Sequence, residues 1–245
     1  MREVLDPRGA VAALEALRFQ STMVLHFAVL GAVLGLDVVS FPQAMISRPL
    51  VAATLAGALV GEPGRGLLVG AVLELVALET LPVGASRYPE WGSAAVVGGA
   101  LYALHPEGSA GALVLAVTCA LATAFVGGES MILLRRLNGQ LARAQAPLLR
   151  AGSLRSVSLL QFAGFGFDLL RGFALTVVAL YLSLPLLAAT VGHWGADPRL
   201  SRAVVVSVAA TVAGSAVWKL FHTVPLARVL FAAGIAAGLV GLAVR

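Results

Sequence analysis

The chain has 245 residues, of which 59% are hydrophobic and only 12% are charged, and its formal net charge is +5. Soluble domains carry about 25% charged residues. This composition therefore excludes an ordinary water-soluble enzyme, a disordered protein and a nucleic-acid-binding protein. The mean hydropathy of +0.94 instead predicts an all-α integral membrane protein that lies in a lipid bilayer.

The N-terminal segment, residues 1–22, precedes the first long apolar run. It has acids among its bases and no apolar core that ends in a small-residue cleavage site, so we expect no cleaved signal peptide. Val11, Leu14 and Leu17 lie at helical spacing, with charged residues on other faces. This pattern predicts a short helix at the membrane interface, followed by a single transmembrane domain over residues 23–245.

The apolar segments of that domain vary in length. In chain order they are Met23–Val39, Pro49–Gly61, Gly66–Leu81, Ser93–Leu104, Ser109–Leu134, Val157–Val191, Ala203–Trp218 and Val229–Val244. A helix needs about 20 apolar residues to cross a bilayer, and several segments are shorter. An isolated short helix would leave unsatisfied backbone groups in lipid, at several kcal/mol each. We therefore predict a multi-span helical bundle with short re-entrant or broken helices, as in transporters.

The most polar stretch of the chain is residues 135–155, which holds five arginines and no acid. Cytoplasmic loops of membrane proteins carry an excess of Lys and Arg. The stretch is therefore predicted to be a basic cytoplasmic loop. It also fits a loop that docks a soluble partner.

Common catalytic and cofactor motifs are not found in the sequence. It has one cysteine and four scattered histidines, and it lacks a phosphate-binding loop, a His-Glu-x-x-His motif and a Gly-x-Ser-x-Gly motif. We therefore expect no catalytic residue, no cofactor and no metal site on this chain.

The remaining candidates for a binding site are the charged residues within the apolar segments. A charge at the centre of a membrane helix costs about 2.5–3.5 kcal/mol, so such a residue usually faces a cavity or a partner charge. Glu74 and Glu79 are five residues apart, about 140° around a helix, so they cannot share one site on a continuous helix. Asp168 and Arg171 are three apart on one face, which favours a mutual ion pair.

A sugar is one ligand that suits such groups. Carboxylates accept hydroxyl protons, and the Gln43 amide both donates and accepts. Phe41, Tyr88 and Trp91 lie close in sequence to Gln43 and Glu90 and could flank a sugar ring. The same aromatic residues also fit an anchoring role at the membrane interface.

The stretch between about residues 35 and 100 resembles the mannose/fructose/sorbose-family IIC component of the bacterial sugar phosphotransferase system. The residues that carry the resemblance are Gly35-Leu36-Asp37, Gln43, Ser47-Arg48-Pro49-Leu50, Gly66, Gly70, Glu74, Val83-Gly84-Ala85 and Pro89-Glu90. Leu169-Leu170-Arg171-Gly172-Phe173 resembles an arginine-bearing helix start of the same family.

The resemblance implies a permease subunit in the bacterial cytoplasmic membrane. Such a subunit pairs with a IID-like membrane subunit, forms trimers of IIC–IID pairs, and carries a hexose inward. Soluble IIA and IIB proteins supply the phosphoryl group, so no phosphoryl-accepting residue is expected on this chain. The substrate-binding residues carried over are Asp37, Gln43, Arg48, Glu74 and Glu90. Of these, Gln43 and Glu74 are expected to hydrogen-bond the sugar, and Arg48 to orient a carboxylate or cap a broken helix.

Two other functions fit the same residues. A cation- or proton-coupled secondary transporter would use the same carboxylates without soluble partners. A non-transporting membrane scaffold or sensor with a IIC-like fold would move no sugar.

Overall fold

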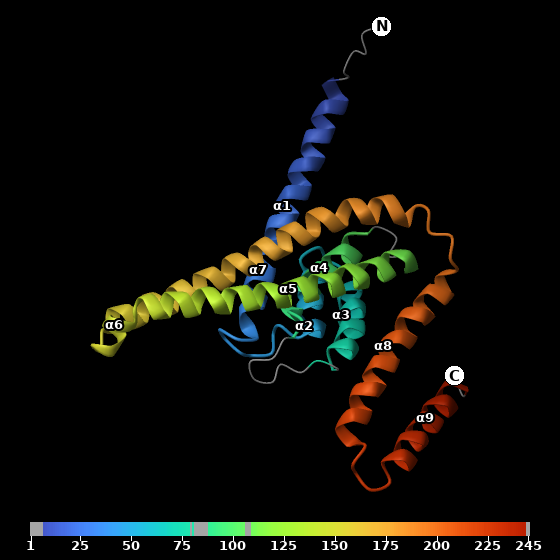
Figure 1. The fold of residues 1–245 in the computed structure, drawn as a ribbon. Coiled ribbons are helices and arrows are strands. Elements are labelled where there is room, and N and C mark those ends of the chain that lie inside the picture. The colour runs from blue at the N-terminus through green and yellow to red at the C-terminus, as the bar shows by residue number, and fades with distance from the viewer. Residues whose placement is uncertain (1–6, 79, 81–87, 106–108, 244–245) are drawn as a thin grey trace.

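The computed structural model describes residues 7–78, 80, 88–105 and 109–243, with the side chains of 7–20, 220, 239, 242 and 243 left out. Within these ranges the structure is helical and has no strand, which confirms the predicted all-α class (Figure 1). The helices are α1 (Pro7–Asp37), α2 (Pro49–Ala58), α3 (Pro63–Ala77), α4 (Trp91–Leu104), α5 (Ala110–Ala144), α6 (Ala146–Arg150), α7 (Leu154–Val191), α8 (Pro198–Phe221) and α9 (Ala227–Ala243).

Helix α4 forms the centre of the molecule. Every residue from Trp91 to Ala103 is buried, and the helix packs against α1, α2, α3, α5 and α7. Gly99 shows why this segment is rich in small residues, because a Cβ there would lie 2.6 Å from the backbone oxygen of Ala53. Helices in membrane proteins approach closely at such positions.

The short helices α2 and α3 pack on each other and on α4. Each begins with a proline, Pro49 or Pro63, whose missing N–H costs nothing at a helix start. The turn between them passes through Gly61 at φ +79°, a conformation that glycine adopts readily. A Cβ on Gly66 would lie 2.1 Å from the Ala53 oxygen, so this helix pair depends on the small residues seen in the sequence. The short helices α2 and α3 therefore pack against other helices, as expected for short helices in a membrane bundle.

Among the described residues, three helices are long and apolar enough to cross a membrane: α5, α7 and residues Pro198–Lys219 of α8. They match three of the predicted apolar segments. Helix α7 runs continuously for 38 residues with Pro185 in its interior.

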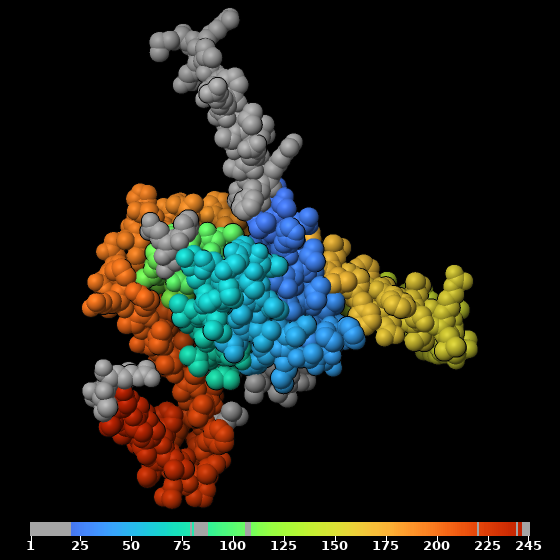
Figure 2. Space-filling view, turned by 180° about the vertical axis from the view of Figure 1, so that it is seen from behind, coloured from blue at the N-terminus to red at the C-terminus, as the bar shows by residue number. Residues whose placement is uncertain are grey.

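Residues 135–155 differ from the predicted loop. Helix α5 continues to Ala144, and only α6 and its flanking turns separate it from α7. The last five residues of α5, Gln140–Ala144, are Gln, Leu, Ala and Arg, which are strong helix formers, so the basic residues extend the helix instead of ending it. The ends of α5 and α7 with α6 project from the rest of the molecule (Figures 1 and 2); we call this projection, residues 135–160, the basic arm.

The N-terminal segment also differs from its predicted bounds. Helix α1 passes residue 22 without a break and ends at Asp37, so the proposed interfacial helix and the first apolar segment form one helix. Helical periodicity in both segments is continuous, and no glycine or proline separates them after Gly9 until Gly31. The first half of α1 extends away from the other helices in Figure 1.

Helices α8 and α9 form a V-shaped pair at the C-terminal end (Figures 1 and 2). Helix α8 contacts α3 and α5. Within the pair, the rings of Trp218 and Phe231 meet edge to face at 5.7 Å. The described side chains from 228 to 241 are all exposed, so α9 leaves a wide apolar surface uncovered.

Candidate functional site

The segment between α1 and α2, residues 38–48, forms a loop organised by Asp37. One carboxylate oxygen, Oδ1, accepts a hydrogen bond from the Ala44 N–H at 2.7 Å. The other, Oδ2, accepts bonds from the N–H of Ser47 at 3.0 Å and from its hydroxyl at 2.8 Å. Asp37 is only 2% exposed. Both carboxylate oxygens of Asp37 therefore hold the loop in place. Asp37 can influence a bound ligand by positioning the residues of this loop.

Gln43 lies in the middle of this loop in a left-handed conformation, with φ +58°, as does Met45 with φ +61°. Such conformations cost about 1–3 kcal/mol for residues other than glycine and cluster at functional sites. The Gln43 amide Nε2 donates to the Val39 carbonyl at 2.9 Å, and the side chain is exposed. The Asp37 bonds therefore hold Gln43 in a strained but accessible position.

Arg48 and Glu74 form an ion pair that joins the start of α2 to α3. The Arg48 Nε donates to Glu74 Oε1 at 2.7 Å, and Nη2 contacts the same oxygen. The other oxygen of Glu74 accepts from the N–H of Leu50 at 3.2 Å, in the first turn of α2. A carboxylate is stabilised at a helix N-terminus by the free N–H groups and the helix dipole. Arg48 thus orients the Glu74 carboxylate, and this carboxylate caps the N-terminus of the short helix α2.

A cavity of about 390 Å³ lies beside this loop; we call it the loop cavity. Its lining residues are Asp37, Val38, Gln43, Met45, Ser47, Arg48, Pro49, Thr80, Tyr88, Pro89 and Trp91. Three of the five predicted site residues are in this lining. Glu74 is not, but it is hydrogen-bonded to Arg48, which is.

Two polar groups in the wall of the loop cavity are buried without a partner among the described residues. They are the Thr80 hydroxyl oxygen and the Trp91 ring nitrogen, Nε1. Buried polar atoms are nearly always hydrogen-bonded in native proteins, and exceptions call for a ligand or water. Thr80 was missed by the sequence reasoning because a lone threonine after an apolar helix carries no pattern. Tyr88 and Trp91, which the sequence suggests as residues that flank a sugar ring, both line the cavity.

Glu90 lies outside the cavity lining. It is 1% exposed and caps α4, where its Oε1 accepts from the Ser93 N–H at 3.1 Å. Its backbone N–H donates to the Ala124 carbonyl of α5 at 2.8 Å. The structure therefore separates Glu90 from the other predicted site residues, because an N-cap position turns its carboxylate into the helix packing.

Arg171 connects Glu90 to the loop through a buried charge network. The Arg171 Nε donates to Asp168 Oδ1 at 2.9 Å, so the predicted ion pair is present. Its Nη1 lies 4.0 Å from Glu90 Oε2 and donates to the Ser130 hydroxyl at 3.2 Å. Asp168 Oδ2 accepts from the hydroxyl of Ser40 at 2.7 Å. One guanidinium thus joins α4, α5 and α7 to the loop that carries Gln43.

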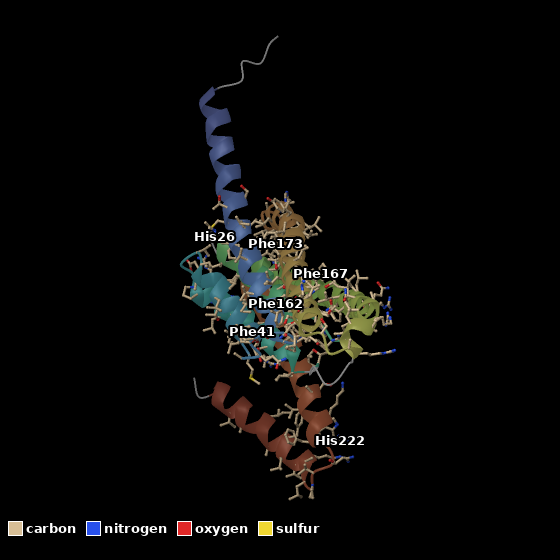
Figure 3. All side chains as sticks on the ribbon, turned by 90° about the vertical axis from the view of Figure 1, so that its left-hand side faces the viewer. His26, Phe41, Phe162, Phe167, Phe173 and His222 are labelled. Carbon is tan, nitrogen blue, oxygen red and sulfur yellow. The ribbon has the colours of Figure 1, made fainter. Side chains whose placement is uncertain are left out.

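Other residues that the sequence singled out lie elsewhere. Glu79 and the run Val83-Gly84-Ala85 are outside the described residues. His26 on α1 and His222 at the end of α8 are far apart (Figure 3). No three His, Cys, Asp or Glu side chains in the described part of the chain are grouped so that they could hold a metal ion.

The chain is similar to IIC components of known sugar transport systems. The chain is 25% identical over 173 residues to the fructose permease IIC component of Bacillus subtilis (strain 168), covering 71% of this chain and 62% of that protein. It is 26% identical over 137 residues to the PTS system sorbose-specific EIIC component of Klebsiella pneumoniae, covering 56% of this chain and 49% of that protein. The alignments thus span about half to three-fifths of these relatives.

Two solved structures share the fold. One, described only as the structure of a membrane protein, has a TM-score of 0.69. The other is the mannose transporter ManYZ in complex with microcin E492, with a TM-score of 0.56. In both cases the identity is 18%, and 91% of each chain is covered.

A family model for the PTS system sorbose-specific IIC component matches residues 19–198. This range includes the loop cavity, the Arg48–Glu74 pair and the network around Arg171. The chain therefore belongs to the family of sorbose-specific IIC components of the PTS system, as the sequence motifs predicted.

Proposed function

We propose that this chain binds a hexose-type sugar in the loop cavity and carries it inward across the bacterial cytoplasmic membrane, as the IIC subunit of a sugar phosphotransferase system. The observation that carries the proposal is the cavity itself. It combines an amide, a guanidinium, hydroxyl groups and aromatic rings, and two of its buried polar groups have no described partner. Such a set of donors and acceptors suits a ligand with many hydroxyl groups.

The chemistry of the lining favours an uncharged sugar. The charge of Arg48 is balanced by Glu74, and the oxygens of Asp37 are occupied by the loop. The Gln43 amide, the Thr80 hydroxyl and the Trp91 ring N–H remain to bind sugar hydroxyls. The rings of Tyr88 and Trp91 offer flat surfaces for the apolar face of the sugar. Glu74 acts on the sugar by orienting Arg48, with which it is paired.

The names of the relatives support the partners that we propose. The proteins to which the chain is similar are named as IIC components of fructose and sorbose systems, and ManYZ is a mannose transporter. We propose a IID-like membrane subunit as the partner in the membrane, in a trimer of IIC–IID pairs. The exposed apolar surface of α9 supports an interface with lipid or with such a subunit. Soluble IIA and IIB proteins would carry the phosphoryl group, which requires no nucleophile on this chain.

Sugar uptake tests the proposal. The chain is expressed with its genomic neighbours in cells that lack their own hexose phosphotransferase permeases, and uptake of labelled fructose, sorbose and mannose is measured. We expect uptake of at least one sugar, and Gln43→Leu is expected to lower it about tenfold or more, because a lost hydrogen bond leaves a sugar hydroxyl unpaired. The matched control is Gln140→Leu, on the exposed face of the basic arm.

The same assay separates the alternatives. Uptake that persists after the proton gradient is collapsed, but stops without the soluble phosphoryl carriers, supports the phosphotransferase subunit. Uptake that follows the proton gradient and ignores the carriers would favour a proton-coupled transporter. No uptake of any hexose, with the protein intact in the membrane, would favour the scaffold or sensor.

A further inference from the structure

A second cavity lies where the basic arm leaves the helical body. Its volume is about 360 Å³, and it is enclosed by α5, α7 and the loop after α1; we call it the arm-base cavity. Its polar lining residues are Ser40, Arg135, Asn138, Gln161 and Asp168. In Figures 1 and 2 this is the base of the projection formed by α5 and α7. None of the motifs in the sequence pointed to it.

The two cavities are lined by neighbouring residues of one loop. Val38 lines the loop cavity, whereas Val39 and Ser40 line the arm-base cavity. A side-chain pair also bridges them, since Tyr88 lines the first and Arg135 the second. The Arg135 Nη2 donates to the Tyr88 hydroxyl at 2.9 Å, and its guanidinium carbon lies 5.3 Å from the centre of the Tyr88 ring. A single layer of residues therefore separates the two spaces.

The chemistry of the arm-base cavity resembles that of the loop cavity. Asn138 Oδ1 is buried and has no partner among the described residues. Gln161 adds a second amide, Asp168 adds a carboxylate that already accepts from Ser40, and Phe165 adds a flat ring. Two amides, a carboxylate and an aromatic ring suit a polyhydroxylated ligand.

The charged groups of the lining are engaged with neighbouring side chains. Asp168 is ion-paired with Arg171, and Arg135 donates to the Tyr88 hydroxyl. The other polar lining residues, Ser40, Asn138 and Gln161, are uncharged and can bond to the hydroxyl groups of a neutral sugar.

We propose that the arm-base cavity is a second binding site for the same hexose-type sugar, on the inward side of the loop cavity. The inference rests on the proposed function. The basic arm begins at this cavity, and the positive-inside tendency places its arginines in the cytoplasm, so the second site faces the side where the sugar is phosphorylated. The segment Val38–Ser40 is the partition between the two sites, and the Ser40–Asp168 bond fixes it to α7.

Protection of single cysteines from a maleimide tests the two sites separately. The only native cysteine, Cys119, is buried. It is first replaced by alanine (Cys119→Ala), and the single cysteines are introduced into this variant. Ala142→Cys reports on the arm-base cavity and Met45→Cys on the loop cavity, since both residues are in the linings. Ala144→Cys, exposed near the end of α5, is the matched control. The full chain is labelled in membranes that also contain the products of its genomic neighbours, with and without fructose, sorbose or mannose.

At a sugar concentration about twice the dissociation constant, mass action lowers the unoccupied fraction of a site about threefold. We expect the labelling rate to fall by that factor at Ala142→Cys and at Met45→Cys, and to stay unchanged at Ala144→Cys. We also expect Asn138→Leu to remove the protection at Ala142→Cys and to keep it at Met45→Cys.

The other outcomes separate the two proposals. Protection at Met45→Cys alone overturns the second site and leaves the proposed function standing. Protection at Ala142→Cys alone supports the second site and overturns the assignment of the loop cavity. Protection at neither position by any of the three sugars overturns both. Equal protection at Ala144→Cys, or protection by fructose 6-phosphate but not by fructose at Ala142→Cys, also overturns the second sugar site.

Discussion

Helices α4 and α9 have similar compositions and opposite surroundings. Both are short and consist mostly of Gly, Ala, Val and Leu, and each has three other residues: Trp91, Ser93 and Tyr102 in α4, and Arg228, Phe231 and Ile235 in α9. Every residue of α4 from Trp91 to Ala103 is buried, whereas Ile235 and Val240 of α9 are 53% and 63% exposed. Apolar composition therefore places a segment in the membrane environment without determining whether protein or lipid covers it.

The two helices also differ in the number of other helices that they contact. Helix α4 contacts five other helices and begins at Glu90, which belongs to the buried network with Arg171 and Asp168. Helix α9 makes an aromatic contact with α8 through Phe231 and leaves the rest of its described surface open. We therefore expect substitutions around α4 to destabilise the fold, and equivalent substitutions in α9 to leave it unchanged.

The largest expected effect comes from Arg171→Leu. This change leaves two buried carboxylates, Glu90 and Asp168, without their cation, and breaking a buried ion pair in this way costs about 3–5 kcal/mol. The expected result is little folded protein, measured as the fraction that elutes as a single peak from detergent-solubilised membranes. Arg171→Lys is the control and should retain part of the yield, because it keeps the charge and loses the forked geometry. A normal yield of Arg171→Leu would show that the network does not hold the body together.

The next effect directly compares the two helices. In Gly99→Ala the new methyl group meets the backbone of Ala53, which cannot move aside, and overpacking of this kind costs about 1–3 kcal/mol. In Gly238→Ala a Cβ has nothing within 4 Å, so no loss is expected. Thermal unfolding in detergent, followed by intrinsic tryptophan fluorescence, measures the difference. Equal midpoints for the two variants would contradict the contrast between a buried and an uncovered helix.

The smallest expected effect on stability comes from Glu74→Gln. Its side chain and that of Arg48 are partly exposed, at 23% and 29%, and pairs of this kind contribute about 1 kcal/mol or less. We expect a near-normal unfolding midpoint together with a strong loss of sugar uptake, because the amide no longer holds Arg48 in the cavity wall by charge. Loss of the fold would make Glu74 a structural residue, and unchanged uptake would remove it from the site.

The sequence by itself determined the class, the family and much of the site. Hydropathy and helical periodicity are local properties, so the apolar segments and the short helices could be read along the chain. The resemblance to the family pointed to Asp37, Gln43 and Arg48, and these three residues line one cavity. The charges of residues 135–155 predict a loop, whereas in the structure α5 continues to Ala144 because its last residues favour a helix.

Only the tertiary structure decided how these residues are used. It engaged both oxygens of Asp37 in the loop, joined Glu74 to Arg48, and turned Glu90 into a buried cap beside Arg171. It also showed that the Thr80 hydroxyl and the Trp91 ring N–H are buried without a hydrogen-bond partner among the described residues. These roles depend on contacts between segments far apart in the chain, such as the Ser40–Asp168 bond between residues 128 positions apart. Hydrophobic pattern is set by neighbours in the chain, whereas charge pairing and unsatisfied polar atoms are set by neighbours in space.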